Sequence, residues 1–347
     1  MKTEKSKRLL IPLLLLLLAA AFFVSFLVGR YRVPAVQAAR LLADRALSLL
    51  SSGRLRLAQT WTAEEASVVV QIRLPRILSA ALIGAALSAA GTSYQAMFRN
   101  PMVSPDLLGA STGAGFGAAL AILLGARYAV VSASAFVFGL GAVSLTYLVG
   151  RLSRIRSNLA MVLSGVMVGS LFSAGTSFIK LVADTEQQLP AITYWLMGSL
   201  SSAKNRDLLF ALIPALIGMV PLFLLRWRIN LLTLGEEEAR SLGVHTTRLR
   251  LIIVICATLI TSACVSVSGM IGWVGLVIPH FARMLFGHDY KRLIPASMLL
   301  GGAFLMVVDN IARLATAGEI PIGILTSVVG APVFVWLILR GGADREH

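Results

Sequence analysis

Apolar runs of about 20 residues recur along almost the whole of this 347-residue chain. A helix of that length covers the ~30 Å hydrocarbon core of a bilayer. The predicted spans are 9–29, 77–97, 107–125, 130–150, 159–179, 208–225, 249–268, 272–287, 293–312 and 320–340. With 57% hydrophobic and only 14% charged residues, the composition lies outside that of soluble globular domains. We therefore expect an all-α polytopic membrane protein with about ten transmembrane helices in a single domain over residues 1–347.

The first run, 9–29, follows a basic segment and has two interpretations, a signal peptide or a retained span. Its apolar length exceeds that of a signal-peptide core, and no small-residue cleavage site follows it. We predict a retained first span.

The net charge of +15 is distributed in a way that predicts topology. If the N-terminus is cytoplasmic, every inner segment contains Lys or Arg; these segments are 1–8, 98–106, 151–158, 226–250, 283–292 and 340–347. The positive-inside rule then places both termini in the cytoplasm. The arginine-rich outer loop 30–76 is the exception, and its segment 40–50 has the pattern of an amphipathic helix lying on the membrane surface. No basic domain interleaved with aromatic residues indicates a nucleic-acid partner.

One pattern points to an enzyme. Residues Gly109 to Gly113 fit G-x-S-x-G around Ser111, which would suit an intramembrane serine hydrolase. That motif needs a strand, a turn and a helix, whereas here it opens an apolar run of small residues. No Walker-type phosphate loop occurs, and no His, Cys, Asp or Glu residues have metal-ligand spacing. We expect no cofactor in this chain, and any use of ATP must come from another subunit.

A short charged segment interrupts the second half of the chain. Gly235 and Gly243 bracket a predicted helix that has Glu236, Glu237 and Glu238 at its start and Arg240 near its end, as the helix dipole prefers. So short a helix is marginal by itself in water. We expect it to dock on a cytoplasmic partner through an apolar side formed by Leu234, Ala239 and Leu242. The alternative is a solvated charged loop.

Polar residues also lie at the membrane boundaries and within the spans. Arg73, Arg76 and Arg313 fall at the predicted outer face, where arginines either snorkel or pair with carboxylates of a partner. For Gln95, Asp309 and Asn310, within or near spans, we expect hydrogen bonds between helices. The stretch FRNPMVSPDLLG, residues 98–109, is the most unusual, because it separates two segments that are both apolar enough for hydrocarbon.

Five separated motifs, in this order, resemble the FecCD family, the permease subunits of bacterial and archaeal ABC importers for iron-siderophores, haem and cobalamin. They are RLPRILSAALIGAALSAAGTSYQAMFRNPMVSPDLLGASTGAG from residue 73, YWLMGSLSS (194–202), LGEEEARSLGV (234–244), GMIGWVGLVIPHFAR (269–283) and EIPIGILTSVVGAPVFVWLILR (319–340). The resemblance covers the chain from about residue 70 to its C-terminus.

The resemblance implies a type II ABC importer permease fold in the cytoplasmic membrane. It divides the chain into an outer loop (30–76), spans two to six (77–225), a cytoplasmic coupling loop (226–248) and spans seven to ten (249–340). It implies a second permease copy in a homodimer, two ATP-binding subunits that use the ATP, and an extracytoplasmic substrate-binding protein. An iron-siderophore is the leading substrate, with haem or cobalamin as alternatives.

The resemblance also assigns roles to residues. It implies a cytoplasmic gate at Asn100, Pro101, Met102, Ser157 and Asn158. It implies binding-protein docking at Arg73, Arg76 and Arg313. It implies ATPase coupling through Leu234, Gly235, Glu236, Glu237, Glu238, Ala239, Arg240, Ser241, Leu242 and Gly243.

Overall fold

The computed structural model describes residues 4–52, 54, 57–153, 158–316 and 318–343, which are almost entirely helical. The α-helices are α1 (Glu4–Leu27), α2 (Ala35–Leu50), α3 (Ala63–Ser67), α4 (Leu74–Phe98), α5 (Ala110–Leu123), α6 (Tyr128–Leu152), α7 (Asn158–Val182), α8 (Gln188–Met197), α9 (Asn205–Leu224), α10 (Arg226–Leu232), α11 (Glu236–Ser241), α12 (Thr246–Ser268), α13 (Val274–Phe286), α14 (Tyr290–Ala315) and α15 (Ile322–Ala343). A π-helix, η1 (Val68–Arg73), precedes α4, and a 3-10 helix, η2 (Pro105–Leu108), precedes α5.

Each predicted span corresponds to one helix, which confirms the all-α membrane fold. Within the described residues, 7 helices are long and apolar enough to cross a bilayer, while α5, α13 and the described apolar part of α15 are shorter. The helix within the predicted span 272–287 is shorter than the sequence indicated. Helix α13 has 13 residues and is therefore ~20 Å long. The chain at 269–273 is not helical, so α13 begins inside the protein.

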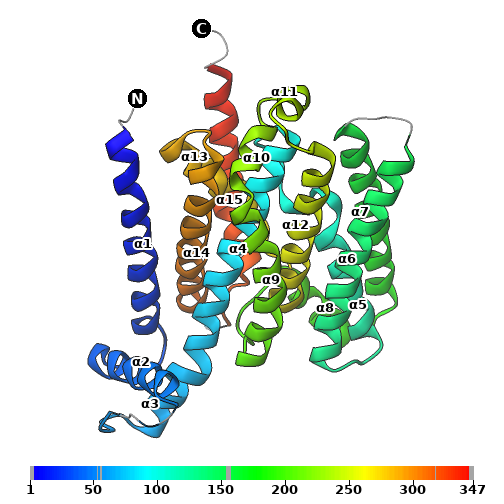
Figure 1. Cartoon of the computed structure of the whole chain (residues 1–347). Coiled ribbons are helices and arrows are strands. Elements are labelled where there is room, and N and C mark those ends of the chain that lie inside the picture. Colours follow the sequence, from blue (N-terminus) through cyan, green and yellow to red (C-terminus); the bar gives the residue numbers. More distant parts are fainter. Residues whose placement is uncertain (1–3, 53, 55–56, 154–157, 317, 344–347) are drawn as a thin grey trace.

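The two ends of the described chain lie at the same end of the bundle as α11, whereas α2 and α3 lie at the opposite end (Figure 1). This arrangement agrees with the predicted topology, in which both termini share one face with the coupling segment. We call the end with α11 the inner end and the end with α2 the outer end.

The outer segment 30–76 is more ordered than a loop. The predicted amphipathic helix is present as α2. Helix α3 begins at a capping box in which the Thr62 side chain and Glu65 bond each other's backbone N–H groups. From Ala63 the chain stays helical through η1 into α4, so this helix begins at 63 instead of at 77.

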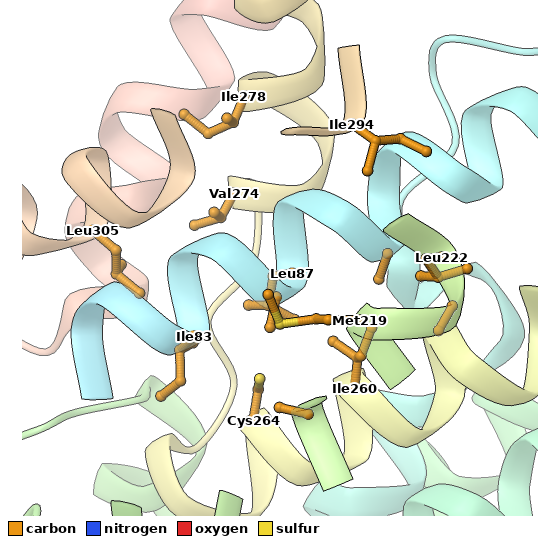
Figure 2. Close-up of a cluster of buried hydrophobic side chains, with 14 of the residues drawn as sticks. Ile83, Leu87, Met219, Leu222, Ile260, Cys264, Val274, Ile278, Ile294 and Leu305 are labelled. Carbon is orange, nitrogen blue, oxygen red and sulfur yellow. The ribbon is translucent and has the colours of Figure 1, made fainter. Parts of the chain in front are cut away.

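Helix α4 is the centre of the bundle, because it packs on α9, α12, α13 and α14 and is buried along most of its length. Figure 2 shows Ile83 and Leu87 of α4 among Met219, Ile260 and Leu305 of the neighbouring helices. Two glycine contacts bring backbones together: a Cβ atom on Gly84 would lie 2.1 Å from the Gly301 carbonyl oxygen, and one on Gly91 would lie 1.8 Å from that of Gly275. Such close approach suits helices that associate within hydrocarbon.

Candidate functional site

The polar stretch after α4 forms a turn at the inner end of the bundle. Arg99 ends α4 in the left-handed conformation (φ 50°), and the Asn100 side-chain oxygen accepts the Met102 backbone N–H at 2.9 Å. Asn100, Pro101 and Met102 are exposed, whereas Val103 and Pro105 are buried. We call residues 99–109 the inner loop. The tip of the inner loop is therefore exposed, while its base is packed into the protein.

Gln95 fastens the base of the inner loop to α13. Its amide nitrogen donates to the carbonyl oxygens of Val103 (3.3 Å) and Leu276 (3.4 Å), and its amide oxygen accepts from Arg283 at 2.6 Å. Gln95 and Arg283 are both buried. A buried side chain that satisfies both of its polar atoms in this way fixes the position of the loop relative to α13.

A cavity of about 510 Å³ lies between the inner loop and α7. Its polar or small lining residues include Ser104, Asp106, Thr112, Gly169 and Ser173. Burial raises the pKa of Asp106 above its usual range, and a hydrogen bond from the Ser111 hydroxyl to its carboxylate acts in the opposite direction. The inner loop thus lines one side of an open depression, which Ser104, Asp106 and Thr112 share with α7.

The second predicted gate element falls at the boundary of the described residues. Ser157 lies outside them, and Asn158 is the first residue of α7. The structure therefore leaves this pair as a prediction.

The coupling segment contains the predicted short helix as α11, from Glu236 to Ser241. Glu236 pairs within this chain, with Arg240 at 2.7 Å and with Arg250 of α12 at 3.4 Å, while its side chain remains 41% exposed. Ala239 is fully buried within this chain, so it leaves the apolar side to the two leucines, and ATPase coupling stays a prediction. Leu234 and Leu242 remain on the surface and are 57% and 58% exposed.

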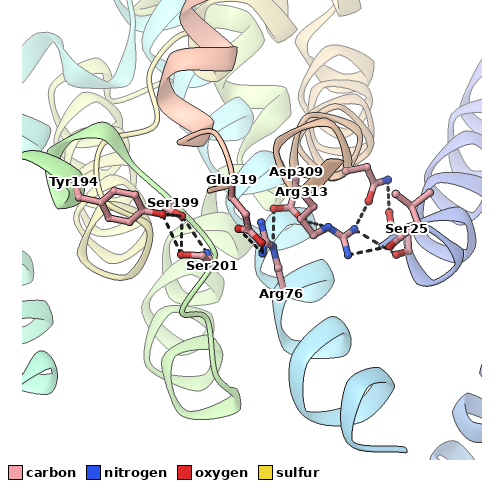
Figure 3. Close-up of polar contacts among 10 residues, drawn as sticks. Ser25, Arg76, Tyr194, Ser199, Ser201, Asp309, Arg313 and Glu319 are labelled. Atoms are coloured by element: carbon pink, nitrogen blue, oxygen red, sulfur yellow. Dashed lines mark hydrogen bonds and ion pairs between the residues drawn. The ribbon is translucent and has the colours of Figure 1, made fainter. Parts of the chain in front are cut away.

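The three arginines of the predicted outer docking site are buried. Arg76 pairs with Asp309 at 2.8 Å and with Glu319 at 3.0 Å, and Arg313 contacts the other carboxylate oxygen of Asp309 at 3.3 Å. The Arg73 guanidinium donates to the carbonyl oxygens of Phe26 and Tyr31. Figure 3 shows Arg76 and Arg313 on either side of Asp309.

This burial corrects the sequence interpretation of the arginines. The side chains of Arg76 and Arg313 are 6% and 8% exposed, and Arg73 as a whole residue is 4% exposed. None of the three presents a free guanidinium to a partner. The carboxylates that hold two of them, Asp309 and Glu319, belong to this chain. Asn310 donates to Ser25 at 2.9 Å, which confirms hydrogen bonding between α14 and α1.

Sequence reasoning missed helix α8, which lies in a predicted outer link. Behind it is a cavity of about 530 Å³ whose lining includes Tyr128, Gln187, Trp195 and Ser202. Next to it the hydroxyls of Tyr194, Ser199 and Ser201 form a cluster with contacts of 3.0 to 3.4 Å (Figure 3). The motif YWLMGSLSS marked this segment, but its helical part was too short to stand out from an outer loop.

The enzyme alternative finds no matching geometry at Ser111. This serine lies in the first turn of α5, directly after η2, and its hydroxyl donates to Asp106. The strand that the serine-hydrolase motif requires does not precede it. Among the described residues, no group of three or more His, Cys, Asp or Glu side chains is placed to hold a metal ion.

Comparison with known proteins identifies a transport family. The model of the FecCD transport family matches residues 16–340. The molybdate import system permease protein MolB of Haemophilus influenzae is 38% identical over 93% of this chain and 94% of its own length. A probable iron chelatin transport system permease protein of Helicobacter pylori is 44% identical over 79% of this chain and 82% of its own. The hemin transport system permease protein HmuU of Yersinia pestis is 39% identical over 80% and 84%, respectively.

A solved structure has the same fold. It is described as an inward-facing conformation of a putative metal-chelate type ABC transporter, is 37% identical in sequence and superposes with a TM-score of 0.83. The match covers 95% of this chain and 99% of that chain.

Proposed function

The chain belongs to the FecCD transport family, and from that premise we propose that it carries a metal-containing solute across the cytoplasmic membrane in an ATP-driven importer. As a member it is the membrane-spanning permease subunit of an ABC importer. The chain contributes contacts that differ between two states of a solute route, and it carries out no bond chemistry.

The observation that carries the proposal is the inner loop. Non-helical backbone at a membrane boundary is tolerated where protein or a water-filled cavity surrounds it. Here Gln95 and Arg283 hold its base, and its C-terminal half lines an open depression beside α7. We assign Asn100, Pro101 and Met102, together with Ser157 and Asn158, to an inner gate at which the inner loops of two copies would meet.

Two copies of the chain would form the route, with their α7 faces turned toward each other. Supporting this, α7 exposes small polar residues such as Ser170 and Ser177, and Ser170 lines the depression beside the inner loop. Their hydroxyls donate to carbonyl oxygens one turn earlier in α7, so this face of small residues is suited to close approach by a second copy.

The partners follow from the two ends of the molecule. At the inner end, two ATP-binding subunits would receive Leu234 and Leu242 together with the exposed Glu237 and Glu238. At the outer end, a substrate-binding protein would dock over α8. We propose that the buried arginines serve docking indirectly, because they hold the outer ends of α4 and α14 in register.

An iron chelate is our first candidate for the substrate, since the iron chelatin relative is 44% identical. Molybdate is the second candidate, because the molybdate permease matches over 93% of the chain. Haem and cobalamin follow, as the hemin permease and a cobalamin permease of Halobacterium salinarum are 39% and 40% identical.

The test is reconstitution. Proteoliposomes with this chain, its ATPase and its binding protein should accumulate one labelled solute in an ATP-dependent manner, and ⁵⁵Fe-siderophore and ⁹⁹Mo-molybdate should be compared directly. Uptake of iron alone supports the first candidate and uptake of molybdate alone the second. If the proteoliposomes take up none of iron-siderophore, molybdate, haem and cobalamin, the proposal is overturned.

A further inference from the structure

A groove on the surface of the helix bundle shares no lining residue with the depression beside the inner loop. It has a volume of about 610 Å³, within the range of ~300–1,000 Å³ that is typical of small-molecule sites. It runs between α6 and α12 and is lined by Leu140, Val143, Ser144, Tyr147, Leu148, Arg151, Leu251, Val254, Ile255, Thr258 and Leu259.

The walls of the groove are apolar. Leu148 is 53% and Ile255 is 56% exposed at its rim. The hydroxyls of Ser144 and Thr258 donate to carbonyl oxygens one turn earlier in their own helices, at 2.8 Å and 2.6 Å. They are therefore already satisfied and add little polarity to the groove.

The groove is about as long as one leaflet of the bilayer is thick, and arginines lie at one end of it. From Leu140 to Arg151, α6 rises ~16 Å, about half of the ~30 Å hydrocarbon core. Arg151 lies in the last turn of α6, toward the inner end, and is exposed. Helix α12 begins at that end, and its exposed Arg248 lies one turn before Leu251 on the groove side. Within the described residues neither arginine has a carboxylate partner.

We propose that this groove binds one anionic phospholipid of the inner leaflet. One acyl chain of the lipid lies in the groove along α6 and α12. The phosphate is held between Arg151 and Arg248 by charge-assisted hydrogen bonds. The proposal rests on the proposed function in one respect. That function places the inner end at the cytoplasmic face, which makes the bound lipid one of the inner leaflet.

The test counts bound lipid by native mass spectrometry. The delipidated full chain is incubated in detergent with equal amounts of phosphatidylglycerol and phosphatidylcholine. We expect a single retained phosphatidylglycerol, and in R151Q/R248Q an affinity weaker by on the order of 30-fold, from about fivefold per arginine near an anionic headgroup. The matched control is R45Q/R206Q, two exposed arginines near the outer end, which should bind as the wild type does.

A second pair of variants tests the groove without changing charge. Ser144→Phe fills it and should abolish retention, whereas Leu145→Phe, next to it on the lipid surface of α6, should not. Equal retention of the two lipids by the wild type, or undiminished phosphatidylglycerol in R151Q/R248Q or in Ser144→Phe, would overturn the proposal. All of these readouts are independent of transport.

Discussion

At the scale of single residues, Asp309 has the largest predicted effect on stability. Its two carboxylate oxygens are shared by two buried guanidinium groups, those of Arg76 and Arg313. Removal of one partner from such a set leaves uncompensated buried charge, which costs ~3–5 kcal/mol. We expect Asp309→Ala to lower the melting temperature of the purified protein markedly. Glu186→Gln, at an exposed carboxylate, is the control; equal melting temperatures in the two variants would show that the network contributes little.

Gln95 has a different role, because it joins the inner loop to α13. In Gln95→Leu, Arg283 loses its 2.6 Å acceptor, and the loop loses the hydrogen bond to the Val103 carbonyl. An unsatisfied buried donor costs ~1–3 kcal/mol. We expect lower thermal stability together with leakage of solute into proteoliposomes without ATP. Gln59→Leu, at an exposed outer residue, should do neither. A tight, stable Gln95→Leu protein would show that the loop is held by other contacts.

The sequence indicated these polar residues but not their partners. Gln95, Asp309 and Asn310 stood out because polar groups within spans are costly and need partners. Whether Arg76 points to a binding protein or back to Asp309 depends on how α4 and α14 pack, which is a tertiary property. The sequence therefore did not show that Arg73, Arg76 and Arg313 are buried within this chain, and their part in docking stays a prediction.

At the scale of elements, glycine contacts determine how closely α4, α13 and the inner loop approach. A Cβ atom on Gly275 would lie 2.5 Å from the Pro105 ring and 2.8 Å from the Leu87 carbonyl oxygen. We expect Gly275→Ala to destabilise the protein by ~1–3 kcal/mol through overpacking. Gly141→Ala, where a Cβ meets nothing within 4 Å, should be neutral or stabilising in thermal unfolding. The reverse order of stabilities would contradict this packing.

Helix α11 offers a test of coupling. Leu234 and Leu242 flank it and are exposed, whereas Ala239 is buried. If the two leucines are covered by an ATPase, Leu234→Ser/Leu242→Ser should weaken ATPase binding by on the order of tenfold or more, because buried leucines contribute ~1.5–3 kcal/mol each before other costs. Copurification with the ATPase measures this. Leu50→Ser, 87% exposed at the outer end, is the control; unchanged copurification of the double variant would remove the assignment.

The lengths of the apolar runs predicted where the helices lie along the sequence better than how much of the bilayer each helix covers. The pattern marked α13 correctly as a helix that follows a break at Gly269 and Gly272, but it did not show how short this helix is. Helix α8 was missed for the opposite reason, since its 10 residues are too few for a span. Hydropathy reports composition over a window, and it does not report whether a helix is long enough to cross the bilayer.

At the scale of the whole molecule, charge distribution predicted that both termini and the coupling segment share one face, and the structure has this arrangement (Figure 1). The relation between two copies could not be read from the sequence, because a face lined by small residues packs equally well within one chain or between two. The proposed route depends on that relation.

The central claim is that the inner loops of two copies meet and close the solute route, and a cross-link tests it most directly. Asn100→Cys is introduced into a chain whose buried Cys256 and Cys264 are replaced by Ala, and Ser144→Cys on the lipid-facing groove is the control. In reconstituted importer, the account predicts that oxidation cross-links Asn100→Cys between copies and lowers ATP-driven uptake at least ~10-fold, and that reductant restores it, whereas Ser144→Cys is unaffected. Absence of the cross-link, or uptake at the wild-type rate while it is in place, would contradict the account.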